Sequence, residues 1–480
     1  MTERNDLQND LHHGTRILVI IGMLAIISNP LRLLRWDVLR FHSFPRWRMC
    51  MKRILFTVLA FLAYTEPLLT YAAEEVKSTP QSGARSENII SVPYGFYNSS
   101  FGAAVAYVYS IVGSPEPQSA FTATAMVGST GTAMLFLIGH DFRMFGVERL
   151  FIDPIVSTGY FVDYNAYISG NPAFPGQRAG SNESNKNNYV TGSGWDNYYR
   201  ITFKYLLPIG NGKDQIVNAY RLKGGLLESG ASGGTSWNPL ESGRTFLQVR
   251  PFYRSQEISS DFVDVAQRTN GLDFTLYWDN RDFSDNPSQG NSLQMRVSRD
   301  FGAFNSSNPW TVYIAELDKY FPLGPSDTFR QRVLAFDIWT AYSPSWEVQP
   351  NGTVANRPPT YAGANLGGLW RMRGFPDQRF SDKAGIYYGA EYRMIPKWNP
   401  FNNWPWLQQY IGVRWVQLVP FVEAGRVAPA WNFDELNSAM KWDGGIGFRA
   451  MCKGLVARID LTASREGASV VMMINQPFQF

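Results

Sequence analysis

Residues 455–462 of the 480-residue chain read LVARIDLT. Every second residue is apolar, and the residues between them include an arginine and an aspartate. The apolar set is Leu455, Ala457, Ile459 and Leu461, and the intervening set is Val456, Arg458, Asp460 and Thr462. Such alternation is typical of a β-strand whose two faces meet different surroundings. The segment therefore predicts a strand with one apolar side and one charged, hydrated side.

The same alternation recurs along the chain, at residues 199–205, 272–279, 293–298 and 333–338. Turn-rich stretches separate these segments. The stretches are 170–197, 207–214, 229–243, 280–290, 305–308 and 351–359. No repeat of fixed length is evident, which argues against a propeller or a solenoid. We predict an all-β fold.

The first 95 residues have a different character from the rest. Residues 51–73 combine a basic start, an apolar run and a small-residue cleavage site, which is the form of a secretory signal peptide. Residues 1–50 are an upstream extension, explained either by a start codon assigned too early or by an unusual membrane-targeting segment. Residues 74–95 are polar and predict a short periplasmic linker. The fold is expected within 96–480.

Charge, cysteine and histidine content exclude several classes of site. Residues 1–72 hold nine Lys/Arg and five Asp/Glu, so the remaining chain has 35 of each and no net charge. A nucleic-acid partner is therefore not expected. Beyond the leader only Cys452 and His140 remain of their kinds. We predict no disulfide, no metal site and no cofactor.

Two all-β architectures fit this pattern, a soluble sandwich and a transmembrane antiparallel β-barrel. Charged residues are only 18% of the chain, below the ~25% of soluble domains, yet they recur in mid-strand opposite apolar faces. The chain is also expected to be exported without a disulfide. A barrel in a bacterial outer membrane accounts for all three features, since lipid meets the apolar face and a wet lumen meets the charges. At ~10 residues per strand, the segment 96–480 allows about 14–18 strands.

The end of the chain fits a last barrel strand. Val470, Met472, Ile474, Phe478 and the terminal Phe480 share one face if the alternation continues to the end. An aromatic residue at this place suits the membrane interface. We predict that Phe478 and Phe480 form a C-terminal targeting signal, although any edge strand can end in phenylalanine.

A stretch of about forty residues, from 343 to 384, separates two clear strands. It contains LWRMRGFPDQRF (369–380), whose aromatic rings need a buried place, and the lumen of a wide barrel is the available cavity. In the strand 415–426, Glu423 lies on the face opposite Val422 and points into that lumen. We predict that Arg373 enters the lumen and pairs with Glu423. The alternative is that Arg373 is one more solvated arginine of the loop.

At these positions the sequence resembles the bacterial surface-antigen superfamily of outer-membrane barrels, which contains the BamA and TamA assembly factors. Met372-Arg373-Gly374-Phe375 is similar to the lumen-loop motif of that family, and Phe421-Val422-Glu423-Ala424-Gly425 resembles its strand motif. The further segments that agree are 278–282 with Pro287 and Gly290, 389–393 and 445–449. The resemblance implies a 16-stranded barrel whose sixth outer loop tucks inside. It implies that Met372, Arg373, Gly374 and Phe375 lock the loop onto Phe421, Glu423 and Gly425.

The chain departs from this family in two respects. Glu423 stands where the family usually has aspartate, a longer arm that should still reach the arginine. Residues 74–95 are also too few to hold a periplasmic POTRA domain, which the assembly factors carry before the barrel. A role in inserting or translocating a protein client would therefore need a separate periplasmic partner, of the POTRA or chaperone type. Outer-membrane lipid is the other expected partner.

Two alternatives to that function remain open. One is a plugged pore or structural barrel without client-handling activity. The other, less favoured, is an outer-membrane hydrolase, because Gly230-Ala231-Ser232-Gly233-Gly234 fits the G-x-S-x-G motif. That motif marks a nucleophile only between a strand and a helix, and no helical pattern follows it here. We interpret it as a flexible turn, and His140 as a strand-end residue, and predict that the chain is not an enzyme.

Overall fold

The computed structural model describes residues 88–98, 100–349, 354–474 and 476. The expected extension (1–50) and signal peptide (51–73), and with them Phe478 and Phe480, lie outside the described residues. So do residues 74–87 of the expected linker. No helix in the described part of the chain is long and apolar enough to cross a bilayer.

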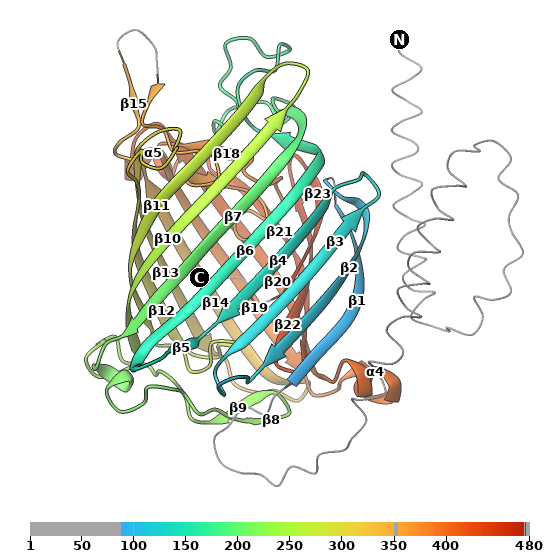
Figure 1. Ribbon diagram of the computed structural model, residues 1–480. Helices are drawn as coiled ribbons and strands as arrows, with labels where there is room; N and C mark the ends of the chain where they lie inside the picture. Colours follow the sequence, from blue (N-terminus) through green and yellow to red (C-terminus); the bar gives the residue numbers. More distant parts are fainter. Residues whose placement is uncertain (1–87, 99, 350–353, 475, 477–480) are drawn as a thin grey trace, which may run out of the picture. The chain divides into compact units, whose positions relative to one another are not determined.

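One large antiparallel sheet dominates the described residues and closes into a barrel (Figure 1). Its strands are β1 (Asn88–Asn98), β2 (Gly102–Val112), β3 (Ala120–Gly128), β4 (Ala133–His140), β5 (Phe142–Met144), β6 (Val147–Ala166), β7 (Val190–Leu206), β10 (Arg244–Ser259), β11 (Asp264–Asp279), β12 (Gly290–Asp300), β13 (Trp310–Pro322), β14 (Phe329–Tyr342), β19 (Ala384–Pro396), β20 (Val413–Ala428), β21 (Lys441–Cys452), β22 (Leu455–Ser464) and β23 (Gly467–Ile474). Both β4 and β5 pair with β6, and they are separated only by Asp141. Counting them as one broken strand, the 17 strands of the sheet make a 16-stranded barrel, as predicted.

Smaller elements lie in the connections. They are the hairpin strands β8 (Arg221–Lys223) and β9 (Leu226–Ser229), β15 (Glu347–Val348) and β16 (Val354–Ala355), and β17 (Ala364–Leu366) and β18 (Phe380–Asp382), with the short helices η3 (Gly210–Lys213), η4 (Pro400–Asn403), α4 (Pro405–Tyr410) and α5 (Phe433–Leu436). None of these belongs to the barrel wall.

Each wall strand pairs with its neighbours in the chain, so the barrel is a simple meander. The first and last strands, β1 and β23, lie side by side at the closing point. No ladder joins them among the residues that the structure places. The barrel is therefore nearly closed, with a seam between its two ends.

The two faces of the wall follow the alternation in the sequence. On β22, Ile459 and Leu461 are 40% and 48% exposed on the outside, whereas Arg458 and Asp460 are buried inside. Apolar side chains such as Phe274 and Phe336 are likewise exposed on their own strands. A wide apolar belt of this kind is disfavoured in water and suits hydrocarbon, while the charges face the interior. The predicted all-β barrel is confirmed.

The two ends of the barrel carry different connections. We call the end at which β1 begins and β23 finishes the inner end, and the opposite end the outer end. The long outer-end connections are 167–189, 343–383 and 429–440, and the long inner-end connections are 207–243 and 397–412. In Figure 1 the inner end is at the bottom, where β8, β9 and α4 are labelled.

The first strand begins earlier than the expected boundary at residue 96. β1 starts at Asn88 and pairs with β2 along its whole length. Ile90 is buried on the inner face, opposite Ser110, and Ile89 is exposed on the outer face. The polar residues around this segment hid the alternation, so the last eight residues of the predicted linker belong to the barrel.

Candidate functional site

The connection between β14 and β19 forms an ordered loop. β17 and β18 pair and bring Leu366 next to Phe380, which closes the base of a smaller loop, residues 367–379. We call these residues the loop tip. Its chain reverses sharply at Gly367 and Gly368, whose φ angles are 110° and 104°, and at Met372, whose φ is 54°. A Cβ at Gly367 would lie 2.1 Å from the carbonyl oxygen of Pro376, so this turn requires glycine.

The apolar side chains of the loop are buried against the barrel wall. Leu366, Met372, Phe375 and Phe380 are each no more than 4% exposed. They form one core cluster with wall residues, which include Trp310, Trp339 and Tyr387. The rings of Phe375 and Phe380 meet edge to face, with centroids 5.1 Å apart. Burial of these side chains favours the position of the tip inside the barrel.

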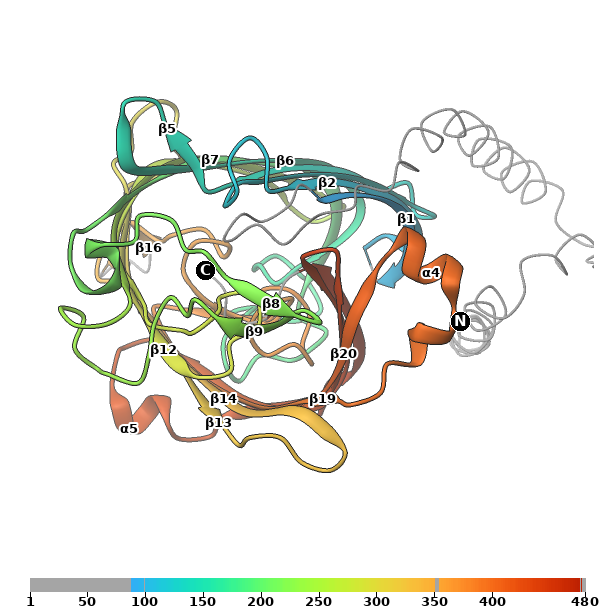
Figure 2. The same ribbon diagram turned by 90° about the horizontal axis from the view of Figure 1, so that it is seen from below.

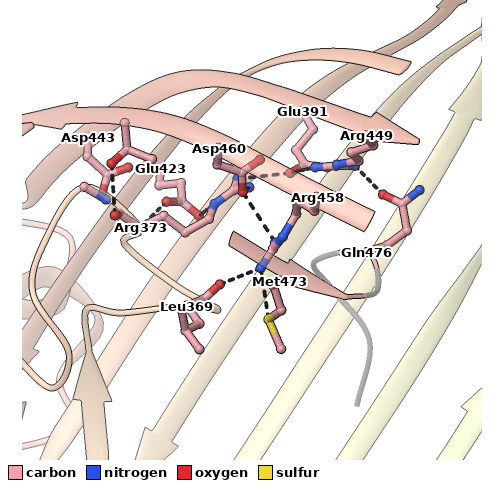
Figure 3. Close-up of polar contacts among 12 residues, drawn as sticks. Leu369, Arg373, Glu391, Glu423, Asp443, Arg449, Arg458, Asp460, Met473 and Gln476 are labelled. Atoms are coloured by element: carbon pink, nitrogen blue, oxygen red, sulfur yellow. Dashed lines mark hydrogen bonds and ion pairs between the residues drawn. The ribbon is translucent and has the colours of Figure 1, made fainter. Parts of the chain in front are cut away.

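Arg373 lies at the centre of the tip, and its side chain has no exposed surface. Its Nε donates to Oε1 of Glu423 at 3.1 Å, and its own backbone N–H donates to Oε2 of the same carboxylate at 2.7 Å. Nη1 donates to Asp460 at 2.7 Å and Nη2 to Glu391 at 3.0 Å. Figure 3 shows the guanidinium among these three carboxylates. The structure thus brings Arg373 and Glu423 together, and adds two partners.

The other residues of the strand motif also meet the tip. The Phe421 ring lies under the guanidinium of Arg373, with its centroid 3.7 Å from Cζ. A Cβ at Gly425 would lie 2.7 Å from Leu366 and 3.2 Å from the sulfur of Met372, so glycine there lets the loop approach the wall. Tyr387 of β19 donates its hydroxyl to Glu423 at 2.5 Å. Glu423 is therefore fixed by three donors.

The backbone of the tip is hydrogen-bonded to β21 and β22. The N–H of Gly374 donates to Asp443 at 3.1 Å, and its carbonyl accepts from Ser464 at 2.9 Å. The carbonyl of Arg373 accepts from Thr462 at 3.1 Å. A Cβ at Gly374 would lie 2.6 Å from the Cβ of Asp443, so the close approach needs glycine.

Sequence reasoning missed Glu391 and Asp460 as partners of Arg373. Glu391 also accepts from Arg449 at 2.7 Å and from Arg393 at 2.8 Å, so one carboxylate meets three guanidinium groups. Asp460 lies 3.5 Å from Arg458, whose Nη2 donates to the carbonyl of Leu369 in the loop tip at 2.9 Å. The group of buried charges around Arg373 is Arg373, Arg393, Arg449, Arg458, Glu391, Glu423, Asp443 and Asp460. We call it the lumen charge cluster.

The signal for these residues was present in the alternation. Glu391 and Asp460 each lie at an inward position of a wall strand, and Asp460 stands out, with Arg458, because the two charges interrupt an apolar segment. The pattern indicates which face a charge occupies. It does not indicate which strands are opposite the loop, and that knowledge is needed to choose a partner.

Arg371 and Arg379, the other two arginines of the stretch 369–380, are also paired rather than solvated. Arg371 donates to both carboxylate oxygens of Glu316, at 2.6 and 2.5 Å. Arg379 donates to both oxygens of Glu466, at 2.7 and 2.8 Å, and to the carbonyl of Ser184 at 2.6 Å. All three arginines of the stretch therefore tie the loop to other segments.

Ser232, the serine of the G-x-S-x-G motif, takes part in structural hydrogen bonds. Ser232 is buried, and its Oγ donates to the carbonyl of Arg281 at 2.9 Å and accepts from the Tyr220 hydroxyl at 2.9 Å. The glycine-rich stretch is therefore not the flexible turn that we expected. The next element after it in the described chain is a strand, β10, and not a helix. Ser232 lacks the strand–turn–helix setting that a nucleophile of this motif requires.

His140 lies in a separate group with Asp141 and Asp153, whose ligand atoms are within 4.8 Å of one another. This is the geometry of a candidate cation site. The ammonium group of Lys204, however, lies 2.5 Å from each of the two carboxylates. The positive charge that these carboxylates need is thus supplied by the chain itself.

Comparisons with known proteins support the fold only. No protein-family model and no curated protein sequence matches the chain. Among solved structures, CdiB from Escherichia coli aligns with a TM-score of 0.50 at 11% identity, over 83% of this chain and 62% of that chain. CdiB from Acinetobacter baumannii gives 0.44 at 12% identity, over 82% and 60%. BamA from Haemophilus ducreyi lacking POTRA domains 1–3 gives 0.42 at 13%, over 81% and 69%. The chain spans less than two thirds of either CdiB chain.

Proposed function

We propose that the chain is an integral β-barrel of the bacterial outer membrane that acts in the insertion or translocation of proteins, together with a separate periplasmic partner. We place it in the bacterial surface-antigen superfamily, beside the BamA- and TamA-like factors. The observation that carries this proposal is the contact between Arg373 and Glu423, 3.1 Å apart inside a 16-stranded barrel. These two residues stand at the positions where the loop and strand motifs of that family place a lock.

The lock gives the loop a defined role. Residues 372–375 hold the tip against Phe421, Glu423 and Gly425 by hydrogen bonds, ring contact and close backbone approach. A loop fixed in this way keeps the lumen filled and stiffens the wall between β19 and β22. We infer that it stabilises this part of the wall, which ends at β22, the strand next to β23 and the seam.

The seam supplies the place at which a client would engage. β1 and β23 are adjacent, yet no ladder connects them within the described residues. A strand edge with unpaired N–H and C=O groups is a template for another strand. A client β-strand could add to either edge by ordinary antiparallel pairing. The client class is therefore a protein segment that becomes a strand at the membrane.

Depletion of the chain in its native host tests this function. We expect folded outer-membrane barrels, measured by heat-modifiable migration on gels, or a secreted client, measured at the cell surface, to fall. Wild-type chain should restore them and the Arg373→Ala variant should not. Co-purification should recover a periplasmic protein of the POTRA or chaperone type. Unchanged levels of every outer-membrane and secreted protein after depletion would overturn the proposal.

A plugged structural barrel is the second candidate, and a specific observation favours it. The outer-end loops are joined to one another: Arg178 forms an ion pair with Asp382, and the N–H of Ser381 donates to the carbonyl of Gly180 at 2.7 Å. Such interlocked loops suit a barrel that stays shut. Loss of envelope integrity on depletion, with client levels unchanged, would favour this candidate.

A further inference from the structure

The inner-end connection between β7 and β10, residues 207–243, crosses the mouth of the barrel. Figure 2, which looks at the inner end, shows β8 and β9 lying across the ring of wall strands. Connections at this end are otherwise mostly short, as between β21 and β22, where only Lys453 and Gly454 intervene. A long ordered connection that covers an opening calls for a physical explanation.

The part that covers the mouth is a hairpin with a register shift between Arg221 and Leu222. β8 and β9 pair with Leu222 opposite Leu227 and Lys223 opposite Leu226. The turn between them is Gly224-Gly225, with φ angles of 59° and 79°. Two successive residues with positive φ form the tight turn that matches the twist of a hairpin, and glycine adopts it readily. The two glycines therefore set the reversal of the chain at the tip of the hairpin.

The tip of the hairpin reaches the far wall. The indole Nε1 of Trp415 donates to the carbonyl of Gly225 at 3.0 Å. Tyr220, Leu226 and Leu227 pack on one buried cluster. The cluster consists of Phe283 and four inward-facing wall residues from β19 to β22, namely Ile395, Trp415, Met451 and Val456. Apolar burial thus closes the gap between hairpin and wall.

The base of the hairpin is fixed on the turn between β11 and β12. Ser232 donates through its N–H to the carbonyl of Asp282 at 2.9 Å, and through Oγ to that of Arg281 at 2.9 Å. The side chain of Asn280 donates to the carbonyl of Gly234 at 2.8 Å and accepts from its N–H at 2.9 Å. A Cβ at Gly233 would lie 2.3 Å from the backbone of Asn280, so the backbone at Gly233 packs directly against this turn.

We propose that residues 218–230 close the inner mouth of the lumen, and we call these residues the inner seal. Ser232 anchors the seal to the barrel. The anchor lies at the turn between β11 and β12, and the tip contacts β20, which is five wall strands on from β11. The seal therefore spans the opening. This inference goes beyond the proposed function, because it holds whether or not a client passes through the barrel.

The two attachments of the seal differ in kind. The anchor consists of one backbone–backbone hydrogen bond and several bonds between side chains and backbone groups, all to one turn, and each is costly to break when buried. The tip is held by one indole hydrogen bond and by apolar contact. Opening would therefore begin at the tip, with the seal swinging away from Trp415 while Ser232 stays in place.

Thiol labelling of a residue behind the seal tests the proposal. Both native cysteines are replaced by serine, and Gln417→Cys is introduced as the reporter, because Gln417 is 2% exposed and faces inward on β20 beyond Trp415. Leu240→Cys, at a position 68% exposed on the same connection, is the accessible reference. A hydrophilic, membrane-impermeant maleimide is applied to the purified full chain in nanodiscs, and the labelling rates are compared.

The seal is then removed by replacing residues 220–229 with two glycines. The ends already touch, since a Cβ at Gly230 would lie 2.1 Å from the carbonyl oxygen of Ala219. The matched control replaces residues 400–409, which contain most of α4 and lie outside the ring of strands in Figure 2. A milder variant, Leu226→Asn with Leu227→Asn, weakens the tip only. Heat-modifiable migration on gels verifies that each variant is folded.

We expect the reporter in the intact chain to react at least about tenfold more slowly than the reference, and seal removal to abolish most of that difference. The milder variant should give an intermediate rate, and the control deletion should leave the rate unchanged. A reporter that reacts as fast as the reference in the intact chain would overturn the proposal. So would a reporter that stays equally slow after the seal is removed, since the loop tip alone would then close the lumen.

Discussion

The carboxylate of Glu423 accepts from both the side chain and the backbone of Arg373, at 3.1 and 2.7 Å. The two residues are fifty positions apart in the chain and belong to different parts of the barrel, a loop tip and a wall strand. Because the same carboxylate meets the backbone N–H, Glu423 specifies where the loop runs as well as where the guanidinium points. This double contact separates a lock from an ordinary ion pair.

Replacement of Arg373 by lysine tests the geometry of the lock. An ammonium group keeps the charge, but it cannot reach Glu423, Glu391 and Asp460 with the spread of a guanidinium. We expect Arg373→Lys to lower the free energy of unfolding by about 3–5 kcal/mol, the usual cost of breaking a buried ion pair. Urea unfolding in lipid, followed by heat-modifiable migration, measures it. Arg465→Ala, at an exposed arginine of the β22–β23 turn, is the control, and an equal effect of the two substitutions would contradict the lock.

Glu391 should be the most sensitive acid of the lumen charge cluster. It pairs with Arg373, Arg393 and Arg449, so the neutral Glu391→Gln leaves three buried guanidinium groups short of charge. We expect a larger loss of unfolding free energy than for Glu423→Gln, with both exceeding about 2 kcal/mol. The exposed Glu347→Gln serves as the control in the same unfolding series. If Glu391→Gln lowered the unfolding free energy no more than Glu347→Gln does, the three ion pairs would not stabilise the barrel.

Exchange of charges between Arg373 and Glu423 is not expected to restore the barrel. A glutamate at 373 would face Glu391 and Asp460, which both remain negative. The double variant Arg373→Glu with Glu423→Arg should therefore be at least as unstable as either single variant. Recovery of wild-type unfolding in the double variant would mean that Glu391 and Asp460 do not contact residue 373.

Gly374 should tolerate no side chain. An added Cβ would lie 2.6 Å from the Cβ of Asp443, and both residues are on backbones that other contacts hold. We expect Gly374→Ala to cost about 1–3 kcal/mol, as overpacking usually does, and to make the loop easier to cleave. Gly176→Ala is the comparison, because it lies in open space at a φ of 76° and incurs only backbone strain. Similar results for both glycines would contradict the close approach of the tip to β21.

The hydrolase alternative is checked by substitution of Ser232 and His140. Ser232 is occupied as an anchor and His140 lies with Asp141 and Asp153, so neither should support ester hydrolysis. We expect Ser232→Ala and His140→Ala to leave any background hydrolysis of p-nitrophenyl esters by the purified barrel unchanged. Loss of a measurable rate in both variants would overturn the prediction that the chain is not an enzyme.

Much of the fold could be predicted because alternation is a local property. In the segment 455–462 the alternation alone indicates which residues lie on each face of the strand. The limits of the loop at Tyr342 and Ala384 follow from the strands on either side of it. The start of β1 was missed, since Ser91, Pro93 and Gly95 on its outer face do not look apolar. Pairing with β2 makes this segment a strand, and pairing is not a local property.

The site could be predicted only in part. The strand alternation turns Glu423 inward and the family motif agrees with its pairing to Arg373, whereas Glu391 and Asp460 depend on which strands lie opposite the tip. The role of Ser232 could not be predicted from the sequence for the same reason. Its partners are the backbone carbonyls of Arg281 and Asp282. Every residue has such a carbonyl, so the residue types do not indicate which ones accept a hydrogen bond.

A double-mutant cycle between Arg373 and Glu423 tests the lock most directly. Unfolding free energies in lipid are measured for wild type, Arg373→Ala, Glu423→Ala and the double variant. We expect the effects to be non-additive by at least about 1 kcal/mol, as for residues in direct contact. The pair Arg465→Ala and Glu423→Ala should instead add within about 0.5 kcal/mol. Additive effects of Arg373→Ala and Glu423→Ala would contradict a lock formed by these two residues.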